Sequence, residues 1–134
     1  MPSIAFEIRR DGGRVFGVAA GIDRVHLRRL RKGEPEAEWE LDLHGLTAAE
    51  AQRDLRAAIA DARQAGVRCL HVIHGRGRHS EAGAVLRERL PDWLAKPPLD
   101  RHVMAFATAL PEDGGEGAIY VLLRRERGGD RATR

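Results

Sequence analysis

The feature that most constrains the fold is a strand–helix–strand pattern in the middle of the chain. Residues 40–43 alternate polar and apolar side chains, as a half-buried strand does, and residues 67–73 form a second, mostly apolar run. Between the two runs, Thr47 and Glu50 have the spacing of a helix capping box, and apolar residues then recur at helical intervals as far as Gly66. Two strands joined by one helix form a right-handed unit with parallel strands, so the pattern predicts an α/β domain.

The remainder of this domain continues the same alternation. The sequence predicts a second helix over residues 82–90, a turn that begins at Pro91, and strands over residues 102–107 and 118–123. The resulting β-α-β-α-β-β order predicts one α/β sandwich domain with a four-stranded mixed sheet over residues 39–125.

Weaker patterns precede and follow this domain. Residues 1–38 are predicted to form a basic N-terminal extension that contains a weak hairpin around Gly12 and a short helix from Asp23 to Lys32. Residues 126–134 are polar, and we expect a disordered tail there.

The composition is that of a globular protein, and it excludes several classes. The chain of 134 residues is 43% hydrophobic and 32% charged, which is enough for one domain with a hydrophobic core. Aromatic residues make up only 4%, which argues against a base-stacking sheet of the kind that recognises RNA. Cys69 is the single cysteine, so no intrachain disulfide can form. With no apolar run of about 20 residues and no signal-peptide pattern, we expect a cytoplasmic protein that has no membrane partner.

A histidine–glycine step ends each of the two strands predicted to be parallel. These steps are His44-Gly45 and His74-Gly75, and Asp42 lies two residues before the first. Parallel neighbours lie about 4.8 Å apart and end at the same sheet edge, so we expect both imidazoles and the carboxylate to line one crevice. Imidazole can act as base or acid near neutral pH, and glycine lets the backbone approach a phosphate closely. We therefore predict a phosphodiester-cleaving site in which Asp42, His44 and His74 are catalytic.

Each of these residues also has an alternative interpretation. A lone histidine–glycine step is typical of a turn or a helix cap, and Asp42 at a strand end can simply bind loop amides. Asp42 can also orient a histidine tautomer or help to hold a divalent metal such as Mg²⁺ or Mn²⁺. Asp42, His44 and His74 would supply three ligands, although Mg²⁺ prefers more oxygen ligands than this set provides. No spacing of Cys and His indicates structural zinc.

The basic residues are clustered, although the formal net charge of +3 by itself says little. Arginine suits bidentate contact with phosphate, whereas a cluster of charges can also be an ordinary solvated face. The residues predicted to bind nucleic acid are Gly45, Gly75, Arg76, Gly77, Arg78 and His79 at the two strand ends, and Arg28, Arg29, Arg31 and Lys32 in the extension. Gly114, Gly115 and Gly117 are predicted to have a structural role in a turn that shapes the edge of the crevice.

Three segments resemble the signature motifs of the Smr (small MutS-related) domain family: residues 41–46 (LDLHGL), 73–77 (IHGRG) and 114–118 (GGEGA). The resemblance covers residues 39–125, and the basic stretch 27–33 is similar to the lead-in of stand-alone bacterial Smr proteins. It implies a fold like the C-terminal domain of a bacterial translation initiation factor. It also implies endonuclease activity on DNA or RNA, in some members on messenger RNA at stalled or collided ribosomes.

Three functional hypotheses follow. The first is an endonuclease that cleaves RNA, with the ribosome as a candidate partner, and the second is an enzyme of the same fold that nicks DNA. The third is a module that binds nucleic acid or ribosomes without cutting. The Asp42, His44 and His74 set favours the first two, because binding alone does not require it. A two-histidine mechanism without metal is confined to RNA, since DNA lacks the 2′-hydroxyl. The oligomeric state is left open.

Overall fold

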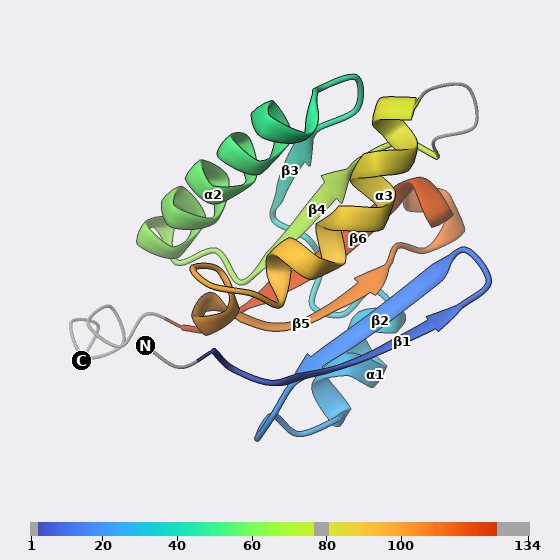
Figure 1. Cartoon of the computed structure of the whole chain (residues 1–134). Coiled ribbons are helices and arrows are strands. Elements are labelled where there is room, and N and C mark those ends of the chain that lie inside the picture. Colours follow the sequence, from blue (N-terminus) through green and yellow to red (C-terminus); the bar gives the residue numbers. More distant parts are fainter. Residues whose placement is uncertain (1–2, 77–80, 126–134) are drawn as a thin grey trace.

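A mixed sheet forms the centre of the molecule. The computed structural model describes residues 3–76 and 81–125, and in this part of the chain six strands are ordered β1-β2-β5-β6-β4-β3 across the sheet (Figure 1). Only β3 and β4 pair in parallel, and the other neighbouring strands pair antiparallel. The strands are β1 (Phe6–Asp11), β2 (Arg14–Ala19), β3 (Trp39–Asp42), β4 (Cys69–Ile73), β5 (Val103–Thr108) and β6 (Ala118–Leu123).

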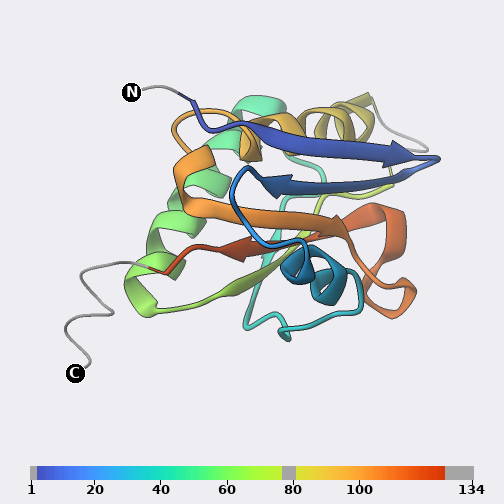
Figure 2. The same ribbon diagram turned by 90° about the horizontal axis from the view of Figure 1, so that it is seen from below.

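Helices cover both faces of the sheet. Helices α2 (Ala48–Ala65) and α3 (Glu81–Leu94) lie on one face, whereas the short α1 (Val25–Arg31) lies on the other (Figures 1 and 2). Single turns of 3₁₀ helix are η1 (Asp100–His102), η2 (Pro111–Asp113) and η3 (Gly115–Gly117). No helix in the described ranges is long and apolar enough to cross a membrane.

The predicted strand–helix–strand unit is confirmed. The Thr47 hydroxyl accepts a hydrogen bond from the Glu50 amide at 3.2 Å, and the Glu50 carboxylate accepts one from the Thr47 amide at 2.9 Å. These reciprocal bonds satisfy two amides that the first turn of α2 would otherwise leave without partners. Gly66 ends the helix with a φ of 78°, a left-handed conformation that glycine adopts without strain.

The prediction of a four-stranded sheet is wrong, because the N-terminal hairpin joins the sheet. Strand β2 pairs with β5, with Phe16 opposite Ala107 and Val18 opposite Ala105. Without β2, strand β5 would present an edge of unpaired backbone groups. The sequence indicates the hairpin but not the strand against which it docks. The domain boundary predicted at residue 38 therefore stays a prediction. In the structure, β1 and β2 belong to the same sheet as the later strands, and α1 packs on one face of that sheet.

Helix α3 also differs from the prediction. It continues through Pro91 to Leu94, whereas Pro91 was expected to begin a turn. Leu86, Leu90 and Leu94 recur every four residues and are at most 1% exposed. Burial of this apolar stripe outweighs the helix hydrogen bond that proline cannot donate.

The two faces of the sheet carry different cores. The face under α2 and α3 holds the larger cluster, which includes Leu43, Leu70 and Phe106. The face under α1 holds a second cluster that includes Cys69, whose thiol has its pKa raised to about 12 by burial. Successive strand residues alternate between these faces, so Leu41 packs toward α2 and α3 while Asp42 belongs to the face of α1.

The attachment of the hairpin depends on Gly17. A Cβ on this residue would overlap the Phe106 ring, which crosses β2 and stacks on Phe6 with ring centroids 6.1 Å apart. We predict that Gly17→Ala lowers the free energy of unfolding by about 1–3 kcal/mol, as overpacking does. Urea denaturation followed by circular dichroism measures this. In a Phe106→Leu background the same substitution should cost less, and an equal cost in both backgrounds would contradict the assignment.

Candidate functional site

The end of β3 presents a paired carboxylate and imidazole. One Asp42 oxygen, Oδ1, accepts hydrogen bonds from the His44 amide at 3.0 Å and from His44 Nδ1 at 2.6 Å. The hydrogen bond from the imidazole holds the pKa of Asp42 below its ordinary value, despite some opposing desolvation. The bond also assigns the proton to Nδ1, which leaves His44 Nε2 with its lone pair directed elsewhere. The side chains of His44 and Asp42 are 68% and 47% exposed, so a large substrate can reach them.

The end of β4 lies directly beside this pair. The Leu43 amide donates to the Ile73 carbonyl at 2.7 Å, which continues the parallel pairing past Asp42. Gly75 has a φ of 84°, and a Cβ placed on it would lie 3.6 Å from the Cβ of His44. Parallel pairing therefore brings the two histidine–glycine steps together at one sheet edge, as the sequence predicts.

His74 has an environment unlike that of His44. It is 5% exposed, and its Nδ1 donates to the Gly75 carbonyl at 2.8 Å. Burial lowers the pKa of His74, and the positive charge of Arg87 on α3 lowers it further. The ring is therefore neutral at neutral pH.

The two imidazoles do not meet. Asp42 lies opposite Ile73 and shares its sheet face, while the next residue, His74, is buried near Arg87 of α3. No hydrogen bond or ring contact joins His44 to His74 within the described residues. The strand ends adjoin as expected, but the His44 side chain is exposed, whereas His74 is buried near Arg87 of α3.

A glycine-rich turn supports the second strand end. The Gly117 carbonyl accepts hydrogen bonds from the amides of His74 at 2.9 Å and Gly75 at 3.0 Å. A Cβ on Gly117 would lie 3.2 Å from Cγ of Arg76, and one on Gly115 would lie 3.5 Å from an Arg76 guanidinium nitrogen. The exposed Arg76 side chain therefore lies along this turn, and side chains in the turn would crowd it. Gly114 and Gly115 also have positive φ angles of 107° and 52°.

A polar network, which sequence reasoning missed, fixes the same turn to the sheet. The Tyr120 hydroxyl donates to the Asp113 carboxylate and accepts from the Leu110 amide at 3.2 Å. His71 Nε2 donates to the Asp113 carbonyl at 2.7 Å, while its Nδ1 lies 3.5 Å from a Glu40 oxygen. Burial and the bond to Asp113 raise the pKa of Tyr120 to about 12. The only sequence signal is the alternation that places His71 on the face of α1, because its partner in the turn is 42 residues away.

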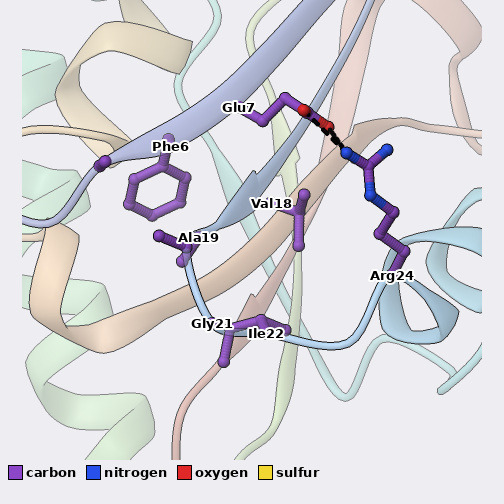
Figure 3. Close-up of a pocket in the computed structure, with 9 residues that line it drawn as sticks. Phe6, Glu7, Val18, Ala19, Gly21, Ile22 and Arg24 are labelled. Carbon is purple, nitrogen blue, oxygen red and sulfur yellow. Dashed lines mark hydrogen bonds and ion pairs between the residues drawn. The ribbon is translucent and has the colours of Figure 1, made fainter.

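The basic residues of the N-terminal segment divide into two groups. Arg28, Arg31 and Lys32 line a hollow of about 350 Å³ together with Arg14, which sequence reasoning did not single out. Arg29 lines a different hollow, which also contains acidic side chains. A third hollow, shown in Figure 3, lies between the ends of β1 and β2 and is mostly apolar.

Two further predictions concern the nucleic-acid-binding residues after Arg76 and a possible metal site. Gly77, Arg78 and His79, which are predicted to contact nucleic acid, lie outside the described residues. Within residues 3–76 and 81–125, no three Cys, His, Asp or Glu side chains converge to hold a metal ion. Asp42, His44 and His74 therefore do not form a three-ligand set in this arrangement.

Comparison with known proteins adds sequence relatives. A family model described as the Smr domain matches residues 41–124. The ribosome rescue factor SmrB of Escherichia coli O157:H7 (strain EC4115 / EHEC) is 42% identical over 114 residues, which cover 85% of this chain and 58% of the relative. SmrB of Klebsiella pneumoniae (strain 342) is 41% identical over 109 residues, covering 81% and 55%. The chain thus spans less than two thirds of the length of these relatives.

Solved structures agree with the sequence comparison. The crystal structure of YdaL, a stand-alone small MutS-related protein from Escherichia coli, superposes with a TM-score of 0.67 at 30% identity over 82% of each chain. The Smr domain of Thermus thermophilus MutS2 gives a TM-score of 0.55 at 38% identity, covering 63% of this chain and 96% of that domain. The expected likeness to an initiation-factor domain stays a prediction. The family match over most of the chain, with the likeness to YdaL, shows that the chain belongs to the Smr domain family.

Proposed function

We propose that this protein is an RNA endonuclease of the Smr type that uses His44 as its general base. The observation that carries the proposal is the Asp42–His44 pair, in which the carboxylate fixes Nδ1 and leaves Nε2 available at an exposed sheet edge. A carboxylate that orients a histidine and stabilises its cationic form is a recurrent catalytic arrangement.

The chemistry starts from the ribose 2′-hydroxyl. His44 Nε2 takes its proton, the 2′-oxygen attacks phosphorus, and the bond from phosphorus to the 5′-oxygen breaks. The 5′-oxygen takes a proton from water, and the hydroxide that this leaves takes the proton from His44 Nε2. The products are a 2′,3′-cyclic phosphate and a 5′-hydroxyl end, and the base is restored. The Asp42 carboxylate stabilises the imidazolium as it forms. Arg76, held along the turn at Gly115, contacts the scissile phosphate and offsets its growing negative charge.

His74 has a positioning role in this proposal, not a proton-transfer role. It is buried, its pKa is lowered, and its Nδ1 already donates to the Gly75 carbonyl. A neutral ring in this place is a poor acid, but it fixes the backbone that leads to Arg76. Of the three residues that the sequence predicts to be catalytic, His44 and Asp42 therefore keep roles in proton transfer, and His74 takes a positioning role.

The name of the relatives supports a substrate at the ribosome. Two SmrB proteins that match most of this chain are called ribosome rescue factors, so we propose messenger RNA on ribosomes as the substrate, in the cytoplasm. The steps above use the side chains of His44, Asp42 and Arg76, and the EDTA experiment below tests whether a divalent metal takes part. DNA nicking and binding without cleavage are outcomes of the experiments below.

Loss of the base should abolish most cleavage. We predict that His44→Ala lowers the rate on end-labelled single-stranded RNA by about 10²–10⁴-fold, the usual contribution of a general base. Asp42→Asn should lower the rate less, because the imidazole stays in place but loses its anionic partner. The end groups should be 2′,3′-cyclic phosphate and 5′-hydroxyl. Cleavage by His44→Ala at the wild-type rate would show that the site assignment is wrong.

Three arms separate the alternatives in the same assay. Activity should persist in EDTA; loss in EDTA and recovery with Mg²⁺ or Mn²⁺ would instead give Asp42 a metal-binding role. Duplex DNA should remain intact, and nicks in DNA would favour the second hypothesis. Binding of RNA or ribosomes without any cleavage would favour the third.

Arg76 should affect both binding and rate. We predict that Arg76→Ala weakens RNA binding and slows cleavage of bound RNA, because its guanidinium contacts the reacting phosphate. The matched control is Arg56→Ala, because Arg56 is exposed on α2, on the face of the sheet that does not carry α1. Single-turnover kinetics at saturating protein separate the two effects. If Arg56→Ala and Arg76→Ala behave alike, Arg76 has no place in the site.

His74 should also make stability dependent on pH. Its pKa in the folded state lies below the ordinary 6.5, so between these two values the unfolded chain binds more protons than the folded one. The free energy of unfolding should therefore fall as the pH drops below about 6.5. Replacement by glutamine, which does not titrate, should reduce this slope in urea denaturation series at several pH values. Burial also lowers the pKa of His102, so part of the dependence of stability on pH should remain in the variant. An unchanged slope in His74→Gln would contradict this environment.

A further inference from the structure

We propose that the hollow lined by Arg14, Arg28, Arg31 and Lys32 binds a backbone phosphate of the RNA strand that is cut at His44. The proposal rests on the proposed function, and it adds a route for the substrate across the sheet edge. The family-model match begins at residue 41, so none of the four residues belongs to the matched domain.

The hollow is lined by four positively charged side chains. All four residues are exposed, and none of them forms an ion pair with a carboxylate in the described part of the chain. Nearby Glu7 is bonded to Arg24 at 2.6 Å, as Figure 3 shows. Asp11 lies opposite Arg14 in the hairpin, without an ion pair to it in the described part of the chain. Four cations around a hollow of about 350 Å³ repel one another, and a bound anion relieves this repulsion.

The arginines are also held in place before any ligand binds. The guanidinium carbon of Arg31 lies 3.8 Å from the centroid of the Phe16 ring, and that of Arg14 lies 5.2 Å from it. Phe16 is 4% exposed and fixed in β2, so the ring forms a rigid support. Stacked guanidinium groups lose less conformational entropy when they bind phosphate, which strengthens binding.

Strand pairing connects this hollow to the site, beginning from Asp42. Asp42 on β3 lies opposite Ile73 on β4, which in turn lies opposite Ala118 on β6. Residues opposite one another share a sheet face, and Ile73 and Ala118 both pack in the cluster under α1. The Asp42 carboxylate therefore belongs to the face that α1 covers.

The row of cross-strand partners that begins at Asp42 continues across the sheet to Arg14. The Ala109 amide donates to the Ala118 carbonyl at 3.0 Å, and the Val15 amide donates to the Thr108 hydroxyl at 2.8 Å. Arg14 precedes Val15, so it lies at the level of Ala109. Its contact with Phe16, which belongs to the cluster under α1, places its side chain on the same face as Asp42.

The spacing suits several nucleotides of one strand. From β2 to β3 there are four inter-strand steps, which is about 19 Å at ~4.8 Å per step. Arg76 follows β4 and reaches Gly115, so it lies between the two ends of this row. A single RNA strand can therefore pass from His44 over Arg76 to the hollow with a phosphate at each cation, as single-strand binding grooves arrange.

The test measures binding separately from cleavage. His44→Ala serves as the background, and its affinity for a single-stranded 12-mer and a trinucleotide RNA is measured by fluorescence anisotropy over a range of salt concentrations. Arg14→Gln and Lys32→Gln remove two cations but leave the stack of Arg31 on Phe16. The double variant Arg53→Gln, Arg56→Gln removes the same two charges from exposed positions on α2 and is the matched control.

We expect the Arg14→Gln, Lys32→Gln double variant to bind the 12-mer more weakly and to lose about 0.7 from the salt slope for each phosphate contact removed. The trinucleotide is too short to span the row and can still bind at the Arg76 end, so it should lose less affinity in the double variant than the 12-mer does. An unchanged salt slope on the 12-mer, or a loss equal to that of the double variant on α2, would overturn the proposal. Weaker binding to ribosomes with unchanged 12-mer binding would also overturn it, because the hollow would then hold ribosomal RNA.

Failure of the proposed function gives a different result. If the wild-type protein cuts no RNA but the double variant loses 12-mer affinity and salt slope as expected, the hollow still binds phosphate and only the catalytic assignment fails.

Discussion

The parallel pairing of β3 with β4 is the constraint on which the rest of the site depends. The bond from the Leu43 amide to the Ile73 carbonyl sets Asp42 opposite Ile73 and brings His44 beside Gly75. Helix α2 makes this pairing possible, because parallel strands need a crossover long enough to return the chain to the starting edge. The capping box that begins α2 and the glycine that ends it therefore contribute to the site without touching it.

The same pairing gives the two histidines different chemistry. Just beyond the strand ends, His44 is exposed with a carboxylate partner, whereas His74 is buried near Arg87 of α3. In the proposed mechanism, water and the Asp42 carboxylate stabilise the cation that His44 forms. A proton on His74 would instead be buried near Arg87, with a backbone carbonyl as its polar partner. One edge of the sheet thus holds an exposed histidine with a carboxylate partner beside a buried, neutral one, which is why we propose different roles for the two.

Sequence reasoning succeeded where the signal is local. The pair of Thr47 with Glu50, the left-handed Gly66 and the apolar runs each determine structure within a few residues. It failed where a partner is distant: the docking of β2 on β5, the bond from His71 to Asp113, and the hollow that Arg14 shares with Arg28, Arg31 and Lys32. It also ended α3 at Pro91, because the rule for proline is local while the burial of Leu94 depends on the whole core. In the candidate site, the sequence predicts that the ends of β3 and β4 adjoin. The different burial of His44 and His74 depends on how the strands pack against the helices, which no local pattern indicates.

The glycine-rich turn at residues 114–117 links the two ends of the proposed RNA path. On one side, the Gly117 carbonyl holds the amides of His74 and Gly75, and the turn lies against Arg76. On the other side, the Glu116 carboxylate occupies the space that a side chain on Gly13 would fill, in the β1–β2 turn just before Arg14. A shift of this turn would therefore move the cation at the site and the hairpin that carries the hollow together. Gly115 and Gly117 leave space for Arg76, and Gly13 leaves space for Glu116, so both contacts depend on positions that have no side chain.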